Sequence, residues 1–429
     1  MSLPPPAALV DVERGTVDRR IFWERELYER ELERIFARCW LFVAHESQLP
    51  EPGSFLTTTM GEDNVIVARG RDGVIRAFLN SCPHRGNRVC HAERGTARGF
   101  VCNYHGWSFG LDGALRGMHE SGAYERTPGF DPAEHGLLQV AQIDAYKGFV
   151  FATFDAEAPP LADYLGDFRW YLDILLDNDD GGTEFVGGCI RSVIACNWKV
   201  AAENFAGDAL HAGWTHDSGA RAMGGASVPT LDGQESYQVN VNGHCWEFNL
   251  DLVGNAATFG DKRVTKNLRV REQELAERLG PLRARMIGAI SSATVFPNMS
   301  FLPGQQTFRT WQPKGPHHTQ LDTWVLVNRS LSDELKEAYR KGVMMTFSPS
   351  GVFEMDDGEN WEYSTRSNAG VVTRAQKLHY GLGLDSRIEH PELKGNVFRS
   401  QLNDANARAF YARWTQLLEA DSWAQVNDR

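Results

Sequence analysis

The sequence predicts an α+β fold in which a small all-β module is inserted near the N-terminus of a larger mixed domain. Three observations support this prediction. Short β-like runs punctuated by glycine fill the segment from Gly53 to Phe154. Helical periodicity precedes this segment and returns after Pro159-Pro160. Helices and antiparallel-looking strands then follow one another in blocks to the C-terminus, which is typical of the α+β class.

Bulk composition limits the function classes. The 429 residues are 42% hydrophobic and 23% charged, as in a globular protein of two or three domains. The net charge of −12 argues against a nucleic-acid or anionic-membrane partner. Neither a spanning apolar run nor a signal peptide is evident, and the seven scattered cysteines do not resemble a disulfide framework. We therefore expect a cytoplasmic protein whose special cysteines bind metal.

Local signals justify each element of the first third of the chain. Tyr28, Leu32 and Ile35 recur at helical spacing and predict a helix from about Trp23 to Phe42. Inside the β module, Arg71-Asp72-Gly73 separates two β-branched runs, which is a hairpin signal.

The rest of the chain alternates between the two periodicities. A helix is expected to begin at the N-cap Ser332, because acidic residues at its start suit the helix dipole. Gly280-Pro281 should interrupt another helix, and Lys314-Gly315-Pro316 should join two strand regions. The remaining predictions are helices over 161–176, 198–211, 271–290 and 404–420, and strands over 294–311 and 321–328.

The β module carries one group of metal-ligand residues. Cys82-Pro83-His84 is followed, after a short interval, by Cys102-Asn103-Tyr104-His105. A zinc ribbon also uses two cysteines and two histidines, but it usually keeps like ligands together. Because each loop here supplies one thiolate and one imidazole, the pattern favours a two-iron cluster with two sulfur and two nitrogen ligands. Cys90 and His91 lie outside this pattern. The other four cysteines are expected to be buried small hydrophobic residues, namely Cys39, Cys189, Cys196 and Cys245.

A second group of ligand residues follows in the larger domain. Asn204, Asp208 and His211 fall at i, i+4 and i+7 and share one helix face. His216 joins them only if the helix breaks, and Gly213 is the expected break. Two imidazoles and one carboxylate form the facial triad that holds non-haem Fe(II) and leaves positions open for O2.

The carboxylate of this triad is expected from the segment 351–361. Phe353, Asp357 and Trp361 are spaced i, i+4 and i+8, which places Asp357 on an inward-facing aromatic stripe. A buried carboxylate needs a cation as a partner. Glu354 is the rival ligand, whereas Asp356 and Glu359 are expected to point elsewhere.

On these motifs the chain resembles the large (alpha) subunit of Rieske-type aromatic ring-hydroxylating dioxygenases, in the biphenyl, toluene and naphthalene dioxygenase group. The resemblance runs from Phe36-Ala37-Arg38-Cys39-Trp40 to the C-terminal helix. It implies a Rieske domain over 40–155 and a helix-grip catalytic domain with a central antiparallel sheet over 1–39 and 156–429. The implied [2Fe-2S] ligands are Cys82, His84, Cys102 and His105, and the implied iron ligands are His211, His216 and Asp357.

The resemblance also implies roles and partners. Asp208 matches an aspartate that links an iron histidine to a cluster histidine, generally across subunits of a trimer, and Asn204 and Asp208 are the catalytic candidates. Because a G-x-G-x-x-G turn after a strand is not evident, electrons from NADH should arrive through a separate reductase and ferredoxin. A small beta subunit is expected to complete an α3β3 assembly. The reaction would use O2 to convert an aromatic hydrocarbon to a cis-dihydrodiol.

The positions that match the family's pocket are mostly apolar, without Lys or Arg, and favour a neutral aromatic substrate. They are Phe205, Ala209, Ser292, Leu302, Gln305, Phe347 and Phe353. Ser292 stands where close relatives often carry a histidine. The segment between Asp217 and Arg269 matches the family least well and is expected to form the pocket entrance.

Three alternatives stay open from the sequence. The same scaffold also supports monohydroxylation or demethylation. A pure electron carrier would need only the β module, and the remaining chain argues against it. A zinc-stabilised binding protein would be colourless, whereas a Rieske centre is red-brown.

Overall fold

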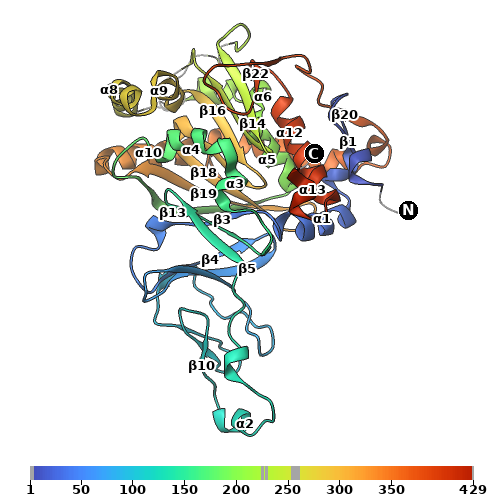
Figure 1. Cartoon of the computed structure of the whole chain (residues 1–429). Coiled ribbons are helices and arrows are strands. Elements are labelled where there is room, and N and C mark those ends of the chain that lie inside the picture. The colour runs from blue at the N-terminus through green and yellow to red at the C-terminus, as the bar shows by residue number, and fades with distance from the viewer. Residues whose placement is uncertain (1–3, 224–226, 228–229, 253–260, 428–429) are drawn as a thin grey trace. The chain divides into compact units, whose positions relative to one another are not determined.

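The computed structural model describes residues 4–223, 227, 230–252 and 261–427. The chain divides into two compact units (Figure 1). One unit is formed by Met1–Ile35 together with Ala162–Arg429, and the other by Phe36–Leu161. A β-rich segment is therefore inserted into a larger α+β unit, as the sequence predicts.

The inserted unit is built from antiparallel sheets. The described strands form the orders β11-β12-β3, β6-β5-β4-β7 and β10-β9-β8. Their bounds are β3 Leu41–His45, β4 Ser54–Met60, β5 Asp63–Arg69, β6 Ile75–Leu79, β7 Arg94–Thr96, β8 Phe100–Val101, β9 Ser108–Phe109, β10 Leu115–Gly117, β11 Gln142–Tyr146 and β12 Phe149–Thr153, and a short helix α2 covers Ser121–Glu125.

The predicted hairpin between β5 and β6 is confirmed. The side chain of Asp72 accepts hydrogen bonds from the backbone N–H of Val74 and from Arg76, and Gly73 takes a left-handed conformation. This is the turn chemistry that short polar residues and glycine provide.

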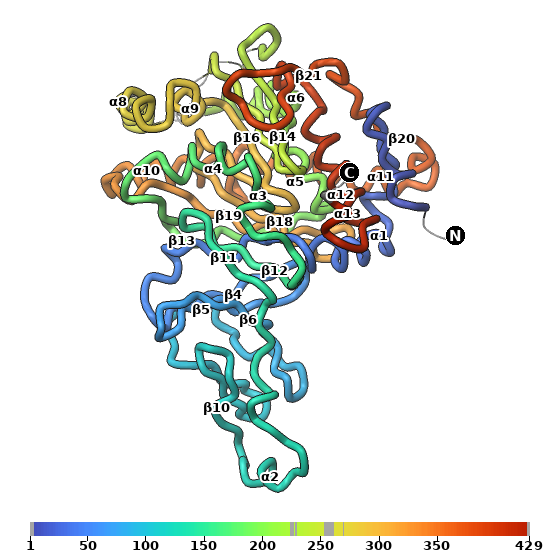
Figure 2. Tube along the Cα trace, viewed as in Figure 1, coloured from blue at the N-terminus to red at the C-terminus, as the bar shows by residue number. Residues whose placement is uncertain are grey.

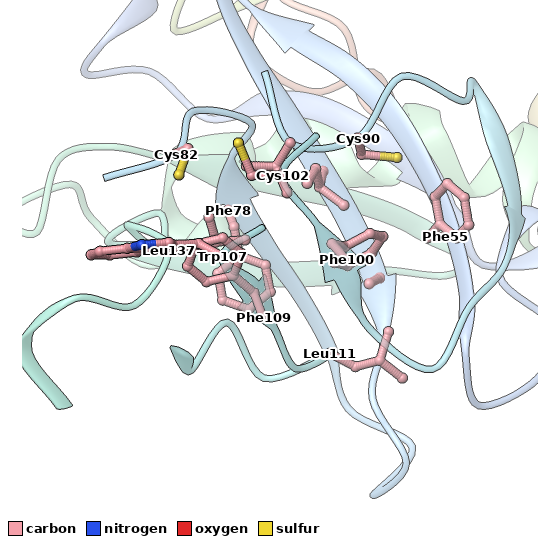
Figure 3. Packing of buried hydrophobic residues seen from close by; sticks show 13 residues of the cluster. Phe55, Phe78, Cys82, Cys90, Phe100, Cys102, Trp107, Phe109, Leu111 and Leu137 are labelled. Atoms are coloured by element: carbon pink, nitrogen blue, oxygen red, sulfur yellow. The ribbon is translucent and has the colours of Figure 1, made fainter. Parts of the chain in front are cut away.

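A buried aromatic and aliphatic cluster forms the core beneath the two ligand loops of this unit. Figure 3 shows Phe78, Phe100, Trp107 and Phe109 within this cluster, with Cys82 and Cys102 close to one another at one end. The side chain of Cys90 belongs to the same cluster but lies away from this pair.

The larger unit is organised around one antiparallel sheet. The strand order is β13-β19-β18-β17-β16-β15-β14-β22-β21. The strands are β13 Thr183–Ile194, β14 Ser236–Val241, β15 His244–Asn249, β16 Ile290–Val295, β17 Met299–Leu302, β18 Thr307–Pro313, β19 Thr319–Asn328, β21 Arg387–Ile388 and β22 Asn396–Arg399. Three further short strands form a separate sheet, namely β1 Val10–Asp11, β2 Thr16–Asp18 and β20 Lys377–His379.

Helices pack against this sheet, as expected for a helix-grip fold. Figure 2 shows α5 and α12, far apart in sequence, lying side by side, and both contact the central strands. The helices are α1 Arg25–Glu31, α3 Leu161–Leu165, α4 Arg169–Leu176, α5 Trp198–Gly207, α6 Ala209–Thr215, α7 Asp217–Ala222, α8 Lys262–Leu279, α9 Pro281–Ile287, α10 Asp333–Thr346, α11 Val352–Asn368, α12 Ala405–Glu419 and α13 Trp423–Asn427.

A buried carboxylate ties α5 and α12 to α1. Glu31 accepts hydrogen bonds from the ammonium of Lys199 (2.6 Å) and from the indoles of Trp198 (2.8 Å) and Trp414 (2.7 Å). Burial lowers the pKa of Lys199, against the attraction of Glu31. Because four polar groups satisfy one another, the start of α5 is held rigidly.

Most predicted elements of the second part of the chain are confirmed. Ser332 caps α10 by accepting a hydrogen bond from the N–H of Leu335, and the break at Gly280-Pro281 separates α8 from α9. The region 294–311 contains the end of β16, all of β17 and most of β18.

Two predictions about these parts of the chain are wrong. The N-terminal helix does not reach Phe42, because a π-turn ends it at Phe36 and Leu41–His45 pairs with β12 instead. Cys189 is exposed, since it lies on β13 at the edge of the large sheet, beside a register shift. In the segment expected to form the pocket entrance, residues 236–249 form strands β14 and β15, while 224–226, 228–229 and 253–260 lie outside the described residues, so the entrance stays a prediction.

Candidate metal centres and active-site pocket

The two ligand loops of the inserted unit have matching backbone geometry. The N–H of Gly86 donates to the carbonyl of Cys82 (2.8 Å), and the N–H of Gly106 donates to the carbonyl of Cys102 (3.0 Å). Both glycines have φ near +70° (73° and 70°), which closes each loop tightly behind its cysteine. Each loop thus presents one thiol and one imidazole in the same way.

The two imidazoles lie next to one another. The ring centroids of His84 and His105 are 4.5 Å apart, and the ring of Trp107 stacks on that of His84 at 4.8 Å with an interplanar angle of 4°. Nδ1 of His84 is buried and has no hydrogen-bond partner within the described part of the chain. A buried, unsatisfied ring nitrogen is costly unless it meets a ligand, so its environment fits metal coordination.

The two thiols complete the group. Burial raises the pKa of Cys82. For Cys102 the same effect is outweighed by hydrogen bonds from the backbone N–H of Tyr104 and the amide of Asn87, and its pKa is lowered. Hydrogen bonds to a thiolate sulfur are the means by which proteins tune an iron–sulfur centre. The donor set fits a cluster with two sulfur and two nitrogen ligands.

In the larger unit, the second group of residues depends on a break between α5 and α6. The break lies at Asp208, not at Gly213, which is inside α6, so the prediction of one helix over 198–211 is wrong. The carbonyls at the end of α5 accept hydrogen bonds from other elements: Gln238 donates to Gly207 O and Asn406 donates to Ala206 O, both at 2.8 Å. Side chains of β14 and α12 therefore replace the helix hydrogen bonds that the turn removes.

This break brings His211, His216 and Asp357 together. Oδ1 of Asp357 lies 3.5 Å from Nε2 of His211 and 3.2 Å from Nε2 of His216. Ligand atoms about 2.1 Å from one ion lie roughly 3 to 3.5 Å apart at angles near 90–110°. One donor atom from each of the three residues lies within 4.8 Å of the others. The spacing fits one divalent metal ion with coordination positions to spare.

Asp208 orients the imidazole of His211 through the ring nitrogen that faces away from Asp357. Nδ1 of His211 faces the carbonyl oxygen of Asp208 and lies 3.4 Å from the Asp208 carboxylate. Asn204 donates to the same carboxylate at 3.2 Å. Burial opposes the charged imidazole, but the hydrogen bond to Asp208 and the charges of Asp208 and Asp357 raise the pKa of His211 to about 9. The site therefore has a negative potential that favours a cation.

The predicted rival of Asp357 is engaged elsewhere. Glu354 accepts a hydrogen bond from the guanidinium of Arg309 at 2.8 Å, and both side chains are buried. Burial raises the pKa of Glu354, and Arg309 opposes this shift. Asp357 is 2% exposed and is the residue of α11 that reaches both histidines.

Asp356 does not point away from the site, as the sequence interpretation had it. Its Oδ2 lies 3.5 Å from Nδ1 of His216, so neighbouring carboxylates of α11 face the two nitrogens of one imidazole. Successive helical residues point about 100° apart, and His216 lies between the two directions. The contact between Asp356 and His216 forms because the C-terminal end of α6 packs close to α11. These residues are far apart in the chain, so the local sequence pattern could not predict it.

The His/His/Asp group opens on a cavity of about 150 Å³. This is about the size of a cavity that takes up benzene. All seven predicted pocket positions line it, namely Phe205, Ala209, Ser292, Leu302, Gln305, Phe347 and Phe353. Neither Lys nor Arg occurs among the described residues of its wall.

The sequence did not lead us to predict an acidic residue of this cavity. Glu247 lies on β15, is 4% exposed and lines the cavity wall. Burial raises its pKa to about 8, against the hydrogen bond from Ser292. A single acidic residue in the run Cys245-Trp246-Glu247-Phe248 was the available signal, because an interior strand rarely carries an unpaired charge.

Comparisons with known proteins match both units. Residues 39–129 match the family model described as the Rieske [2Fe-2S] domain. Residues 161–420 match the model described as the ring hydroxylating alpha subunit (catalytic domain).

The same likeness holds along the whole chain. The biphenyl dioxygenase subunit alpha of Metapseudomonas furukawaii is 42% identical, over 97% of this chain and 94% of the relative. The benzene 1,2-dioxygenase subunit alpha of Pseudomonas putida is 36% identical, over 97% of this chain and 94% of the relative. A crystal structure of a mutant naphthalene 1,2-dioxygenase bound to phenanthrene superposes with a TM-score of 0.92 at 33% identity, covering 98% of this chain and 96% of that one.

Proposed function

The chain belongs to the family of Rieske-type aromatic ring-hydroxylating dioxygenase alpha subunits, and we propose from this premise that its cavity binds a neutral arene for conversion to a cis-dihydrodiol. The chain is an oxidoreductase that uses O2, a Rieske [2Fe-2S] cluster and mononuclear iron. The observation that carries the proposal is the convergence of His211, His216 and Asp357 on one wall of an apolar cavity.

The ligands of the two iron sites follow from the two groups of side chains. Cys82, His84, Cys102 and His105 hold the [2Fe-2S] cluster, and His211, His216 and Asp357 hold the mononuclear iron. The buried and unsatisfied Nδ1 of His84 supports the first assignment. The 3.2 and 3.5 Å separations around Asp357 support the second. We place the electron-transfer domain at 40–155 and the oxygenase domain at 1–39 and 156–429.

An iron held by two imidazoles and one carboxylate supplies open positions where O2 is activated. The protein's own residues prepare this site. Asp208 fixes the ring orientation of His211, and Asn204 holds the Asp208 carboxylate. Phe205, Phe347 and Phe353 provide apolar wall that excludes water and positions the flat face of a ring.

Partners follow from the electron count. Ring dihydroxylation needs two electrons from outside, which a ferredoxin and an NADH-dependent reductase deliver. In a trimer, Asp208 would link His211 to a cluster histidine of an adjacent alpha subunit and so position the two sites for electron transfer. A small beta subunit completes an α3β3 assembly. In the described part of the chain, none of the helices combines the length and apolarity needed to cross a bilayer. We place the enzyme in the cytoplasm.

The decisive experiment supplies the purified enzyme with a surrogate ferredoxin and reductase, NADH and a panel of one- to four-ring arenes under 18O2. We expect a cis-dihydrodiol in which both oxygen atoms carry the label. One labelled atom per product would identify a monooxygenase or demethylase on the same scaffold. A colourless protein without iron and acid-labile sulfide after anaerobic purification would contradict the proposal altogether.

A further inference from the structure

One polar corner of the cavity is formed by Glu247, Ser292 and the backbone of Ala209. Oε1 of Glu247 accepts a hydrogen bond from Oγ of Ser292 at 2.9 Å, and Oε2 accepts one from the backbone N–H of Ala209 at 3.2 Å. All three residues line the cavity. The carboxyl and the hydroxyl come from the neighbouring strands β15 and β16, where Glu247 and Ser292 are directly opposite each other. The rigid central sheet therefore holds the corner in place.

The hydrogen-bond inventory of this corner leaves acceptors open to the cavity. A carboxylate has about four acceptor positions, of which two are used here. The Ser292 hydroxyl donates its hydrogen bond to Glu247, and the lone pairs of its oxygen stay available as acceptors. The corner is thus satisfied internally when a hydrocarbon fills the cavity, yet it can still accept a hydrogen bond from a ligand.

Charge decides which donor suits the corner. Burial raises the pKa of Glu247 to about 8, and a ligand N–H or O–H that donates to the carboxylate lowers this pKa again because it stabilises the charged form. A carboxylated or phosphorylated ligand would bury a second negative charge beside the Glu247 carboxyl, which is unfavourable. A neutral O–H or N–H donor satisfies the corner without burying a new charge.

We propose that Glu247 and Ser292 form a specificity-determining hydrogen-bonding site for a neutral aromatic substrate that carries a hydroxyl or ring N–H donor. This inference rests on the proposed function and narrows its substrate class. It means that the preferred substrates are hydroxylated or N–H-containing arenes, with unsubstituted hydrocarbons accepted less well.

A purely structural role for Glu247 predicts something different. The carboxyl also binds the first N–H of α6, so its loss could shift His211 on that helix. Such a shift would weaken the binding of every substrate to a similar degree. If Glu247 recognises the substrate, its loss changes the ratio of the affinities for ligands that have the same shape and differ only in their hydrogen-bond donor.

The test uses three ligands of nearly identical shape: indole has an N–H donor, benzofuran has an acceptor oxygen and indene has neither. Their dissociation constants are measured with the oxidised holoenzyme under anaerobic conditions, and kcat/KM is measured in the reconstituted system. We expect the preference for indole over indene to fall about tenfold in Glu247→Leu and several-fold in Ser292→Ala. Comparing this preference between wild type and variant cancels the difference in hydration of the free ligands.

Glu247→Gln keeps the shape if the leucine variant fails to fold. Its amide N–H can donate to Ser292 and free the serine proton for the ligand, so we expect the preference to move toward benzofuran. Glu235→Gln is the matched control, because Glu235 is exposed and pairs with Arg285. It should leave all three affinities unchanged.

An indole-to-indene preference that is the same in wild type, Glu247→Leu and Glu247→Gln would overturn the inference, even if every arene is turned over. Equal weakening of all three ligands with reduced iron content would also overturn it and leave a structural role. Failure of the iron-loaded wild type to oxidise any arene would reject the proposed function itself. Anaerobic binding data would still decide whether the corner recognises donors.

Discussion

At the scale of single residues, the two buried carboxylates of α11 have different partners although they are one helical turn apart. Glu354 meets the guanidinium of Arg309, and Asp357 meets His211 and His216. Both are buried acids among aromatic rings, and the sequence pattern favours Asp357 as the metal ligand without showing what Glu354 binds. The structure shows that the partner of Glu354 is the guanidinium of Arg309 on β18.

This difference predicts opposite metal contents for two conservative variants. Asp357→Asn should lose most of the mononuclear iron, because an amide is a weaker ligand for a hard divalent cation. Glu354→Gln should keep the iron but lose roughly 3 kcal/mol of stability, because Arg309 is left buried beside a neutral amide. Metal analysis and thermal unfolding measure both effects. Equal iron loss in the two variants would contradict the assignment.

Asp208 contacts His211 without being one of the three converging ligands, so its role is separable from metal binding. Asp208→Asn should keep the visible absorption of the cluster and the mononuclear iron while turnover falls roughly 100-fold or more. Asp217→Asn is a suitable comparison, because that carboxylate pairs with Arg221 on α7. Wild-type rates for Asp208→Asn would reject its part in electron passage.

His244 predicts a pH dependence of stability. It is fully buried and donates to the carbonyl of Tyr164 (2.9 Å), while its Nδ1 accepts from the N–H of Phe296 (3.0 Å). Burial lowers its pKa to about 3, whereas an unfolded histidine titrates near 6.5. Between these values the unfolded chain binds more protons, so the free energy of unfolding falls as pH drops below about 6.5.

The corresponding measurement compares wild type with His244→Gln. In wild type, the contribution of His244 to the free energy of unfolding should decrease by about 1.4 kcal/mol for each pH unit below 6.5. The glutamine variant lacks this pH dependence. The stability gap between the two proteins should therefore narrow from pH 7 to pH 5. A gap that stays constant over this range would show that His244 is not neutral in the folded state.

At the scale of elements, the break between α5 and α6 positions the whole His/His/Asp group. A Cβ on Gly207 would lie 2.8 Å from Nδ2 and 3.0 Å from Cβ of Asn406, at a φ of +157° that disfavours side chains. Asn406 in turn donates to the carbonyl of Ala206. The turn is thus specified by a glycine and by polar side chains from α12 and β14.

Gly207→Ala should cost about 1–3 kcal/mol and reduce mononuclear iron, because the turn is strained and its buried partner is displaced. Gly342→Ala in α10 is the matched control, since a Cβ there meets open space and alanine favours helix. Unfolding midpoints and iron content compare the two. Unchanged iron in Gly207→Ala would mean that the turn does not set the position of His211.

Elements with strong local signals were predictable, and those decided by distant partners were not. The hairpin at Asp72, the cap at Ser332 and the break at Gly280-Pro281 depend on turn and capping chemistry within a few residues. The strand at Leu41 was predicted as helix, because pairing with β12 overrides its local preference.

At the scale of the whole molecule, each metal site is assembled within one compact unit of the chain. The cysteine and histidine loops belong to the inserted unit, and the His/His/Asp group belongs to the larger one. Each site should therefore load independently. Cys82→Ser should abolish the visible absorption of the cluster yet leave about one iron per chain, which metal analysis and electron paramagnetic resonance would detect. Loss of both sites together would show that their folding is coupled.

By itself the sequence determined the two ligand groups, the α+β class with a β-rich insertion and an apolar pocket, because ligand type, periodicity and turn chemistry are local properties. Tertiary structure alone decided that Glu354 pairs with Arg309, that Asp356 faces His216 and that Glu247 enters the cavity. The physical reason is that each of these contacts joins residues far apart in the chain. Whether a buried acid faces a guanidinium, an imidazole or an empty cavity depends on which element packs against it.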